Sequence, residues 1–232
     1  MTRQIVLDTE TTGLAVSDGH RIIEVGCIEL DNRRLTGRSL HLYVNPERDI
    51  DQGAIEVHGL TREMLADKPL FAHIADEFLA FIADAELLIH NASFDIGFLD
   101  GELARIRREP MIKHCARVTD TLAMARELHP GKRNSLDALC DRYGVSNAHR
   151  KLHGALLDAE LLAEVYLAMT RGQDSLQIVS VASGEDRRGR SDGGSWPPDN
   201  LHVVPADQAE RAAHDALVEA IGKAADRPPL WS

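Results

Sequence analysis

Apolar residues near the start of the chain follow the spacing of β-strands. Gln4–Thr9 and Arg21–Leu30 are mostly apolar and rich in branched side chains, and Arg38–Val44 alternates like a half-exposed strand. The links between these runs are too short for helical crossovers between parallel strands. We therefore expect three antiparallel strands joined by hairpins.

Helices separated by short buried strands follow in the next part of the chain. Ala85–His90 has the pattern of a short buried strand, and Val118–Asp120 that of the end of a fifth strand. Apolar residues at helical spacing predict helices at Leu70–Phe81, Phe94–Ile106, Asn134–Tyr143 and Leu156–Met169. Three strands followed by alternating helices and strands predict an α/β domain with a mixed five-stranded sheet flanked by helices.

The composition changes after about Arg171 and predicts a second, smaller unit. Residues 179–200 have the makeup of a flexible linker. Asp207 and Glu210 form a variant capping box, which predicts the start of a helix within the segment 201–232. A helix this short cannot build its own core, so it packs back on its own domain or docks on a separate partner. The linker favours the partner.

The net charge of -11 limits the possible functions. An acidic protein gains nothing from bulk electrostatics near a polyanion, so charge alone favours an acidic protein without such a partner. Binding to nucleic acid would need local basic residues or metal ions. Lys132, Arg133 and Asn134 could contact a DNA backbone, but a solvated turn explains the same run equally well.

Cysteine usage and the N-terminus indicate the compartment. Cys27, Cys115 and Cys140 lie far apart and form no CxxC pair, so we expect buried thiols in a reducing compartment. The chain shows no signal-peptide pattern and no apolar run near the roughly 20 residues that a membrane helix needs. These features predict a cytoplasmic protein.

Two carboxylates one residue apart follow the first apolar run, in "IVLDTETTGL". Residues i and i+2 of a strand point to the same face, so Asp8 and Glu10 aim together at the strand's carboxyl end, where sites form in open α/β sheets. Taken alone, the pair is better explained as a helix cap beside a solvated carboxylate. A divalent cation held between the two charges is the alternative.

Three further residues change that balance. Asp95 lies in the first turn of a helix that Asn91 or Ser93 can cap, and its charge also suits the helix dipole. Asp158 lies at the apolar start of another helix, and His153 falls in the loop just before that helix. By itself, each has an ordinary explanation, dipole placement for Asp95 and a surface loop for His153.

Together the four carboxylates and the histidine match the needs of two-metal phosphoryl chemistry. Carboxylates bridge and neutralise two ions roughly 3.5–4 Å apart. A histidine can remove a proton from water near neutral pH. Bound ions also reverse the local sign of an acidic site, which lets it accept a polyanion.

Three segments carry a family resemblance: "DTETTGL", "HNASFD" and "HGALLD" resemble, in that order, the motifs of the DEDDh family of 3'-5' exonucleases, which have an RNase H-like fold. The resemblance covers about residues 1–172 and implies an exonuclease domain there. It implies that two Mg2+ or Mn2+ ions bind to Asp8, Glu10, Asp95 and Asp158. His153 would deprotonate the water that attacks the terminal phosphodiester, releasing a deoxynucleoside 5'-monophosphate.

The same resemblance implies contacts to the terminal nucleotide. The implied substrate-binding residues are Glu10, Thr11, Leu14, His58, His90, Asn91 and Phe94. Leu14 would lie against the base, whereas ordinary packing explains the last four equally well. We assign a structural role to Asp120, a fifth acidic residue near this set.

Longer stretches, among them "PGKRNSLDALCDRYGV", resemble the members of this family that proofread for bacterial replicative DNA polymerases. This implies a DNA primer 3' end as substrate, a polymerase alpha subunit bound to segment 201–232, and in some replicases a small theta-like subunit. Residues 173–178 resemble a motif for the sliding clamp beta, with contacts from Gln173, Ser175, Leu176 and Ile178. A frayed helix end is the other explanation of that motif.

Two rival functions remain. The first is a free-standing DNA or RNA exonuclease of the same family, which would need neither linker nor docking segment. The second is a non-catalytic bridge between polymerase and clamp, which would not need the full set of acidic residues.

Overall fold

The computed structural model describes residues 3–148, 152–171 and 207–225. The chain divides into two compact units, Met1–Ile178 and Val179–Ser232. The expected clamp motif at 173–178 and the expected linker at 179–200 lie outside the described residues, so both stay predictions.

The first unit is built on one mixed sheet of five strands in the order β3-β2-β1-β4-β5. The strands β1 and β2 and the strands β2 and β3 pair antiparallel, whereas β1 with β4 and β4 with β5 pair parallel. Their bounds are Arg3–Thr11 for β1, Ile22–Asp31 for β2, Arg34–Tyr43 for β3, Glu86–Ile89 for β4 and Arg117–Asp120 for β5. The predicted hairpins and the mixed sheet are confirmed.

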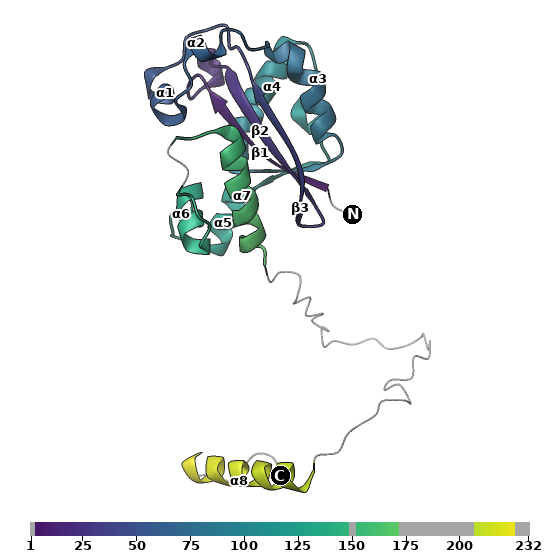
Figure 1. Ribbon diagram of the computed structural model, residues 1–232, viewed down its shortest axis with the longest axis vertical. Helices are drawn as coiled ribbons and strands as arrows, with labels where there is room; N and C mark the ends of the chain where they lie inside the picture. Colours follow the sequence, from purple (N-terminus) through teal and green to yellow (C-terminus); the bar gives the residue numbers. More distant parts are fainter. Residues whose placement is uncertain (1–2, 149–151, 172–206, 226–232) are drawn as a thin grey trace, which may run out of the picture. The chain divides into compact units, whose positions relative to one another are not determined.

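Helices cover both faces of this sheet (Figure 1). Alternate residues of a strand point to opposite faces. On β1, Ile5 and Leu7 join a core with α3 (Phe71–Ile82) and α4 (Ala92–Arg105), while Val6 joins a core on the other face. That second core contains residues of α5 (Thr121–Leu128), α6 (Leu136–Tyr143) and α7 (Ala155–Met169). The four predicted helices are confirmed as α3, α4, α6 and α7.

Some short elements were not predicted from the sequence. They are α1 (Gln52–His58), α2 (Arg62–Leu65), α5 and two 3-10 turns, Val16–Asp18 and Met111–Lys113. Segments of four to eight residues present too few apolar positions to show a helical period. In α5 the missed signal was Asp120, whose carboxylate accepts from the N–H groups of Leu122 and Ala123 at 2.9 and 3.1 Å. This contact supports the structural role assigned to Asp120.

The expected cap of α4 is confirmed in its position but not in its hydrogen bond. Asn91 is the N-cap residue, but its side chain makes no cap hydrogen bond and its φ of 68° is left-handed. Ser93 lies inside the helix, which begins at Ala92. The Asn91 N–H donates instead to the Asp120 carboxylate at 3.3 Å, so Asp120 joins the start of α4 to the start of α5.

The second unit contains the helix α8 (Gln208–Ala225). The predicted capping box is confirmed: Glu210 N–H donates to Asp207 Oδ1 at 2.8 Å, and Asp207 N–H donates to Glu210 Oε2 at 2.9 Å. Leu217 is 60% exposed on this helix. In the described part of the chain, none of the helices has the length and apolar character to cross a bilayer. The three cysteines are buried, as predicted.

Candidate active site

A cavity of about 550 Å³ gathers the five residues predicted to be catalytic: Asp8, Glu10, Asp95, His153 and Asp158. Asp8 and Glu10 come from the carboxyl end of β1, Asp95 from the first turn of α4, and Asp158 from the first turn of α7. His153 lies in the loop before α7, because that helix begins at Ala155 with Gly154 as its N-cap. Residues separated by up to 150 positions in the chain therefore share one cavity.

Gly26 explains how α7 reaches the strand that carries Asp8. Gly26 pairs with Asp8 across β1 and β2. A Cβ on Gly26 would lie 2.2 Å from the Ala155 carbonyl carbon, far inside van der Waals contact. The first turn of α7 therefore rests directly on the sheet backbone, one turn ahead of Asp158.

Three of the cavity residues, Glu10, His153 and Asp158, form a compact group. One ligand atom from each of them lies within 4.8 Å of the others. His153 Nδ1 is 3.3 Å from Asp158 Oδ2. Asp158 is only 3% exposed, whereas 44% of the His153 side chain is exposed. The His153 ring thus contacts the buried Asp158 carboxylate on one side and solvent on the other.

Asp95 is a buried carboxylate with an unusual acidity. It is 3% exposed, and its Oδ1 accepts a hydrogen bond from Thr9 Oγ1 at 2.7 Å. The pKa of Asp95 is raised to about 7, mainly by burial and to a smaller extent by the Asp120 charge, while the Thr9 bond opposes the shift. Such a carboxylate is costly to ionise unless a cation compensates it.

A second cavity of about 450 Å³ contains the residues predicted to meet the terminal nucleotide. Its lining includes Glu10, Thr11, Leu14, His58 and Phe94. Leu14 is 86% exposed. His58 Nδ1 accepts from the Leu60 N–H at 3.0 Å, so the ring carries its proton on Nε2, and burial lowers the pKa of His58. Because Glu10 and Phe94 also line the first cavity, the two cavities are neighbours.

His90 and Asn91 also line the first cavity, but their contacts point to support. His90 Nε2 donates to the Asn134 carbonyl at 2.9 Å, and its Nδ1 lies 3.1 Å from Thr121 Oγ1. Burial lowers the pKa of His90, which keeps the ring neutral. The ring therefore ties the end of β4 to the start of α5 and to the loop before α6.

Several cavity residues were missed by sequence reasoning. One of them is Arg126 of α5, which lines the first cavity. Of the three residues considered as contacts to a DNA backbone, Lys132 and Asn134 line this cavity and Arg133 does not. Thr9, the partner of Asp95, gave no signal, because contacts across elements are absent from a periodic pattern. The other unpredicted residues that line one of the cavities are Leu122, Ser135, Leu136, Asp137, Asp51, Gly53, Ala54, Val57 and Gly13. Part of this wall belongs to the short helices α1 and α5, which were themselves not predicted.

Solved structures share this fold. Exonuclease X in complex with 5' overhanging duplex DNA superposes with a TM-score of 0.56 at 26% identity, over 72% of this chain and 90% of that one. Escherichia coli exonuclease I with a dT13 oligonucleotide gives a TM-score of 0.66 at 19% identity, over 75% of this chain and 42% of that one. The predicted exonuclease fold is confirmed.

Sequence comparisons carry the identification further. The exonuclease family model matches residues 5–166. The chain is 51% identical to the DNA polymerase III subunit epsilon of Salmonella typhimurium and 50% identical to that of Escherichia coli, each over 96% of this chain and 95% of the relative. It is 59% identical to that of Pasteurella multocida, over 75% of this chain and 71% of the relative. The chain belongs to the exonuclease family and, within it, to the DNA polymerase III epsilon subunits.

Proposed function

We propose that this chain removes mispaired 3'-terminal nucleotides for DNA polymerase III, releasing deoxynucleoside 5'-monophosphates. The observation that carries the proposal is the meeting of four carboxylates and His153 in one cavity, in a chain whose close relatives are epsilon subunits of that polymerase. A mispaired end frays at low cost, so selection for mispairs needs no reading of base edges.

The donor set of the cavity fits two divalent cations, Mg2+ or Mn2+. Hard cations take carboxylate oxygens, and Glu10 and Asp158 bring such oxygens within 4.8 Å of one another. Asp95, with its pKa raised to about 7, is a buried carboxylate that a cation would compensate. We assign Asp8 to both ions, Glu10 and Asp158 to the tighter one, and Asp95 to the second. When bound, the ions neutralise charge on the phosphate and make water more acidic.

His153 serves as the general base. A proton on Nδ1, 3.3 Å from Asp158 Oδ2, leaves Nε2 as the acceptor of the ring. Nε2 takes the proton of the attacking water while the water oxygen forms a bond to phosphorus. The bond from phosphorus to the 3' oxygen of the preceding nucleotide breaks in line, and its electron pair stays on that oxygen, which takes a proton from solvent to give the new 3' hydroxyl. This frees the terminal nucleotide.

The second cavity holds that terminal nucleotide. Leu14, which is 86% exposed, offers an apolar face to the base. His58 Nε2 is buried with no hydrogen-bond partner among the described residues, which suits it to donate to the nucleotide. Arg126 and Lys132, on the wall of the first cavity, are placed to meet backbone phosphates of the strand.

The second unit supplies the contact to the polymerase. Every described residue of α8 is exposed or half-buried, and Leu217 provides an apolar contact for the DNA polymerase III alpha subunit. The segment 173–178 binds the sliding clamp beta through Gln173, Ser175, Leu176 and Ile178, and a small theta-like subunit completes the core in some replicases. The chain then works in the cytoplasm as part of the replisome.

The double variant Asp8→Ala with Glu10→Ala tests the metal site. We expect it to lose Mg2+-dependent release of mononucleotides from a mispaired DNA primer, because two ligands of the ions are gone. Glu77→Ala with Asp141→Ala removes two exposed carboxylates outside both cavities and serves as the matched control. Unchanged release in the first variant would refute the metal assignment. Equal degradation of RNA by the unmodified chain would favour the free-standing exonuclease.

A further inference from the structure

The loop that carries His153 is seated on the end of α1. The His153 N–H donates to the Val57 carbonyl at 3.0 Å. The Leu152 side chain lies over Gly59, where a Cβ would be 2.6 Å from Leu152 Cδ1. Gly59, with a φ of 74°, is the left-handed C-cap of α1, so both its backbone and its missing side chain suit glycine. Two contacts, one polar and one apolar, therefore join this loop to α1.

The position of His153 depends on those contacts more than the position of Asp158 does. Asp158 lies in the first turn of α7, is 3% exposed, and belongs to a helix that rests directly on Gly26. His153 precedes the N-cap Gly154, so its backbone lies outside the helix. A glycine between the two leaves the His153 backbone free to turn unless something outside α7 holds it.

We propose that Leu152 is a positioning residue for His153. Its side chain, packed on Gly59, keeps the His153 N–H on the Val57 carbonyl and so holds the imidazole beside Asp158. This inference rests on the proposed role of His153 as general base. Leu152 is 50% exposed, so its contribution to the core is small and its contribution to the geometry can be separated from stability.

The contacts of Leu152 and His153 with the end of α1 also link His153 to the nucleotide cavity. Val57 and His58, which end α1, line the cavity assigned to the terminal nucleotide. The helix α1 therefore contacts the terminal nucleotide and also holds the backbone of His153. A displacement of the loop should change the rate of the chemical step and leave nucleotide binding nearly intact.

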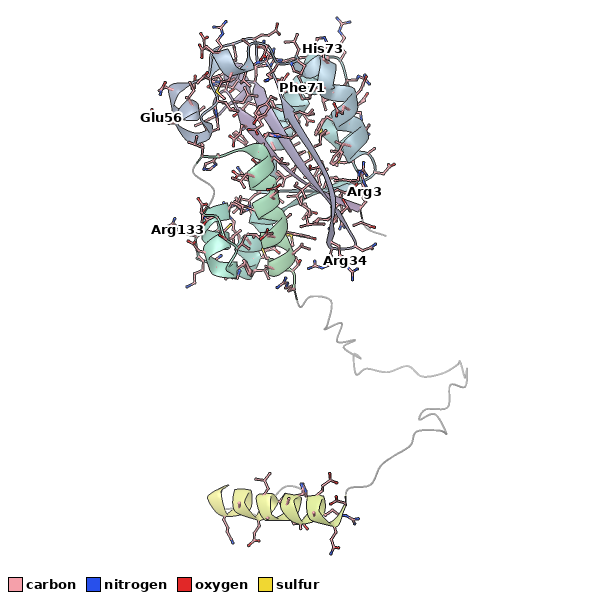
Figure 2. The ribbon with its side chains drawn as sticks, in the orientation of Figure 1. Arg3, Arg34, Glu56, Phe71, His73 and Arg133 are labelled. Carbon is pink, nitrogen blue, oxygen red and sulfur yellow. The ribbon has the colours of Figure 1, made fainter. Side chains whose placement is uncertain are left out.

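The variant Leu152→Ala in the full chain tests the proposal. A misplacement of 1 Å can cost about 100-fold in rate, so we expect the smaller shift of the loop to lower kcat for nucleotide release about tenfold, with KM and the thermal midpoint nearly unchanged. Leu152→Met should restore most of the rate. Leu35→Ala is the matched control, since Leu35 is 54% exposed. Figure 2 shows its neighbour Arg34 at the end of the sheet far from Glu56 of α1.

Two further measurements separate positioning from general damage. In a His153→Ala background, Leu152→Ala should slow the residual rate less than about twofold, because the two residues act through one group. Hydrogen exchange of the His153 amide should quicken about tenfold in Leu152→Ala, because its bond to Val57 is loosened.

Three results would contradict the positioning role of Leu152. A raised KM at unchanged kcat, a tenfold loss that persists without His153, or an equal loss in Leu35→Ala would each overturn the role of Leu152. Failure of the proposed function has another signature. The unmodified chain would release no nucleotide, or His153→Ala would keep the full rate; either result also removes the basis of this inference.

Discussion

Replacing Gly26 with alanine tests whether direct contact between α7 and the sheet places Asp158. The new Cβ would lie 2.2 Å from the Ala155 carbonyl carbon and 2.3 Å from the Leu156 nitrogen, where ordinary contact begins at 3.4 Å. Both atoms belong to the backbone, so no side-chain rotation relieves the clash. Because interiors are close-packed, α7 and β2 must separate by roughly 1 Å.

A separation of that size has a catalytic and a structural consequence. We expect kcat to fall about 100-fold, the usual cost of a 1 Å misplacement, and the free energy of unfolding to fall by about 1–3 kcal/mol through overpacking. Nucleotide release at saturating primer and urea unfolding measure the two effects, both well below the thermal midpoint of the variant.

The matched control is Gly97→Ala on α4, where a Cβ would meet nothing within 4 Å. That variant should keep full activity and gain up to about 1 kcal/mol from helix propensity. A Gly26→Ala protein with normal kcat would refute the claim that this contact sets the position of Asp158.

Three other predictions test the site and the second unit. His153→Ala should lower kcat by about 10²–10⁴-fold, the usual worth of a general base, while primer binding measured by anisotropy stays nearly constant; equal losses in both would contradict that role. The pKa of Asp95 is about 7 in the folded chain, above its unfolded value of about 3.9. Between these two pH values the folded chain binds more protons than the unfolded chain, so the free energy of unfolding falls as pH rises from about 4 to about 7. Between pH 5 and 8 in EDTA, the free energy of urea unfolding should therefore decrease by roughly 1–3 kcal/mol less in Asp95→Asn than in the unmodified chain. Equal decreases in the two proteins would show that the pKa of Asp95 is not raised. Leu217→Asp on α8 should abolish co-purification with a polymerase alpha subunit without affecting nucleotide release, and undiminished co-purification would exclude α8 as the contact.

The parts of the fold that were predicted are those with a period in the sequence. Val6 and its neighbours, and the long apolar stripes of α3 and α7, repeat a hydrophobic signal often enough to be recognised. The helix α1 has seven residues and contains Gly53, and α5 follows β5 with no loop between them. Short elements of this kind are fixed by tertiary contacts and caps, which periodicity does not report.

The residues of the candidate site also fall into a group that the sequence predicted and a group that it did not. Asp8, Glu10, Asp95, His153 and Asp158 stood in motifs with fixed spacing, and each carries chemistry that a structural residue rarely needs. The residues that hold them, such as Thr9 beside Asp95 or Val57 beside His153, act through single atoms. A hydroxyl or a backbone carbonyl has no distinctive sequence signature, so only coordinates reveal these partners.

The candidate site joins β1, the first strand of the first unit, to α7, the last helix among the described residues of that unit. Asp8 is available as soon as β1 is made, but Asp158 and His153 arrive only near the end of that unit, when α7 can settle on Gly26. A chain still on the ribosome, or one cut short before His153 and α7, therefore has Asp8, Glu10 and Asp95 but lacks Asp158 and His153. The candidate site is therefore the last part of the first unit to be completed as the chain is made, whereas the described residues of the second unit add nothing to its lining.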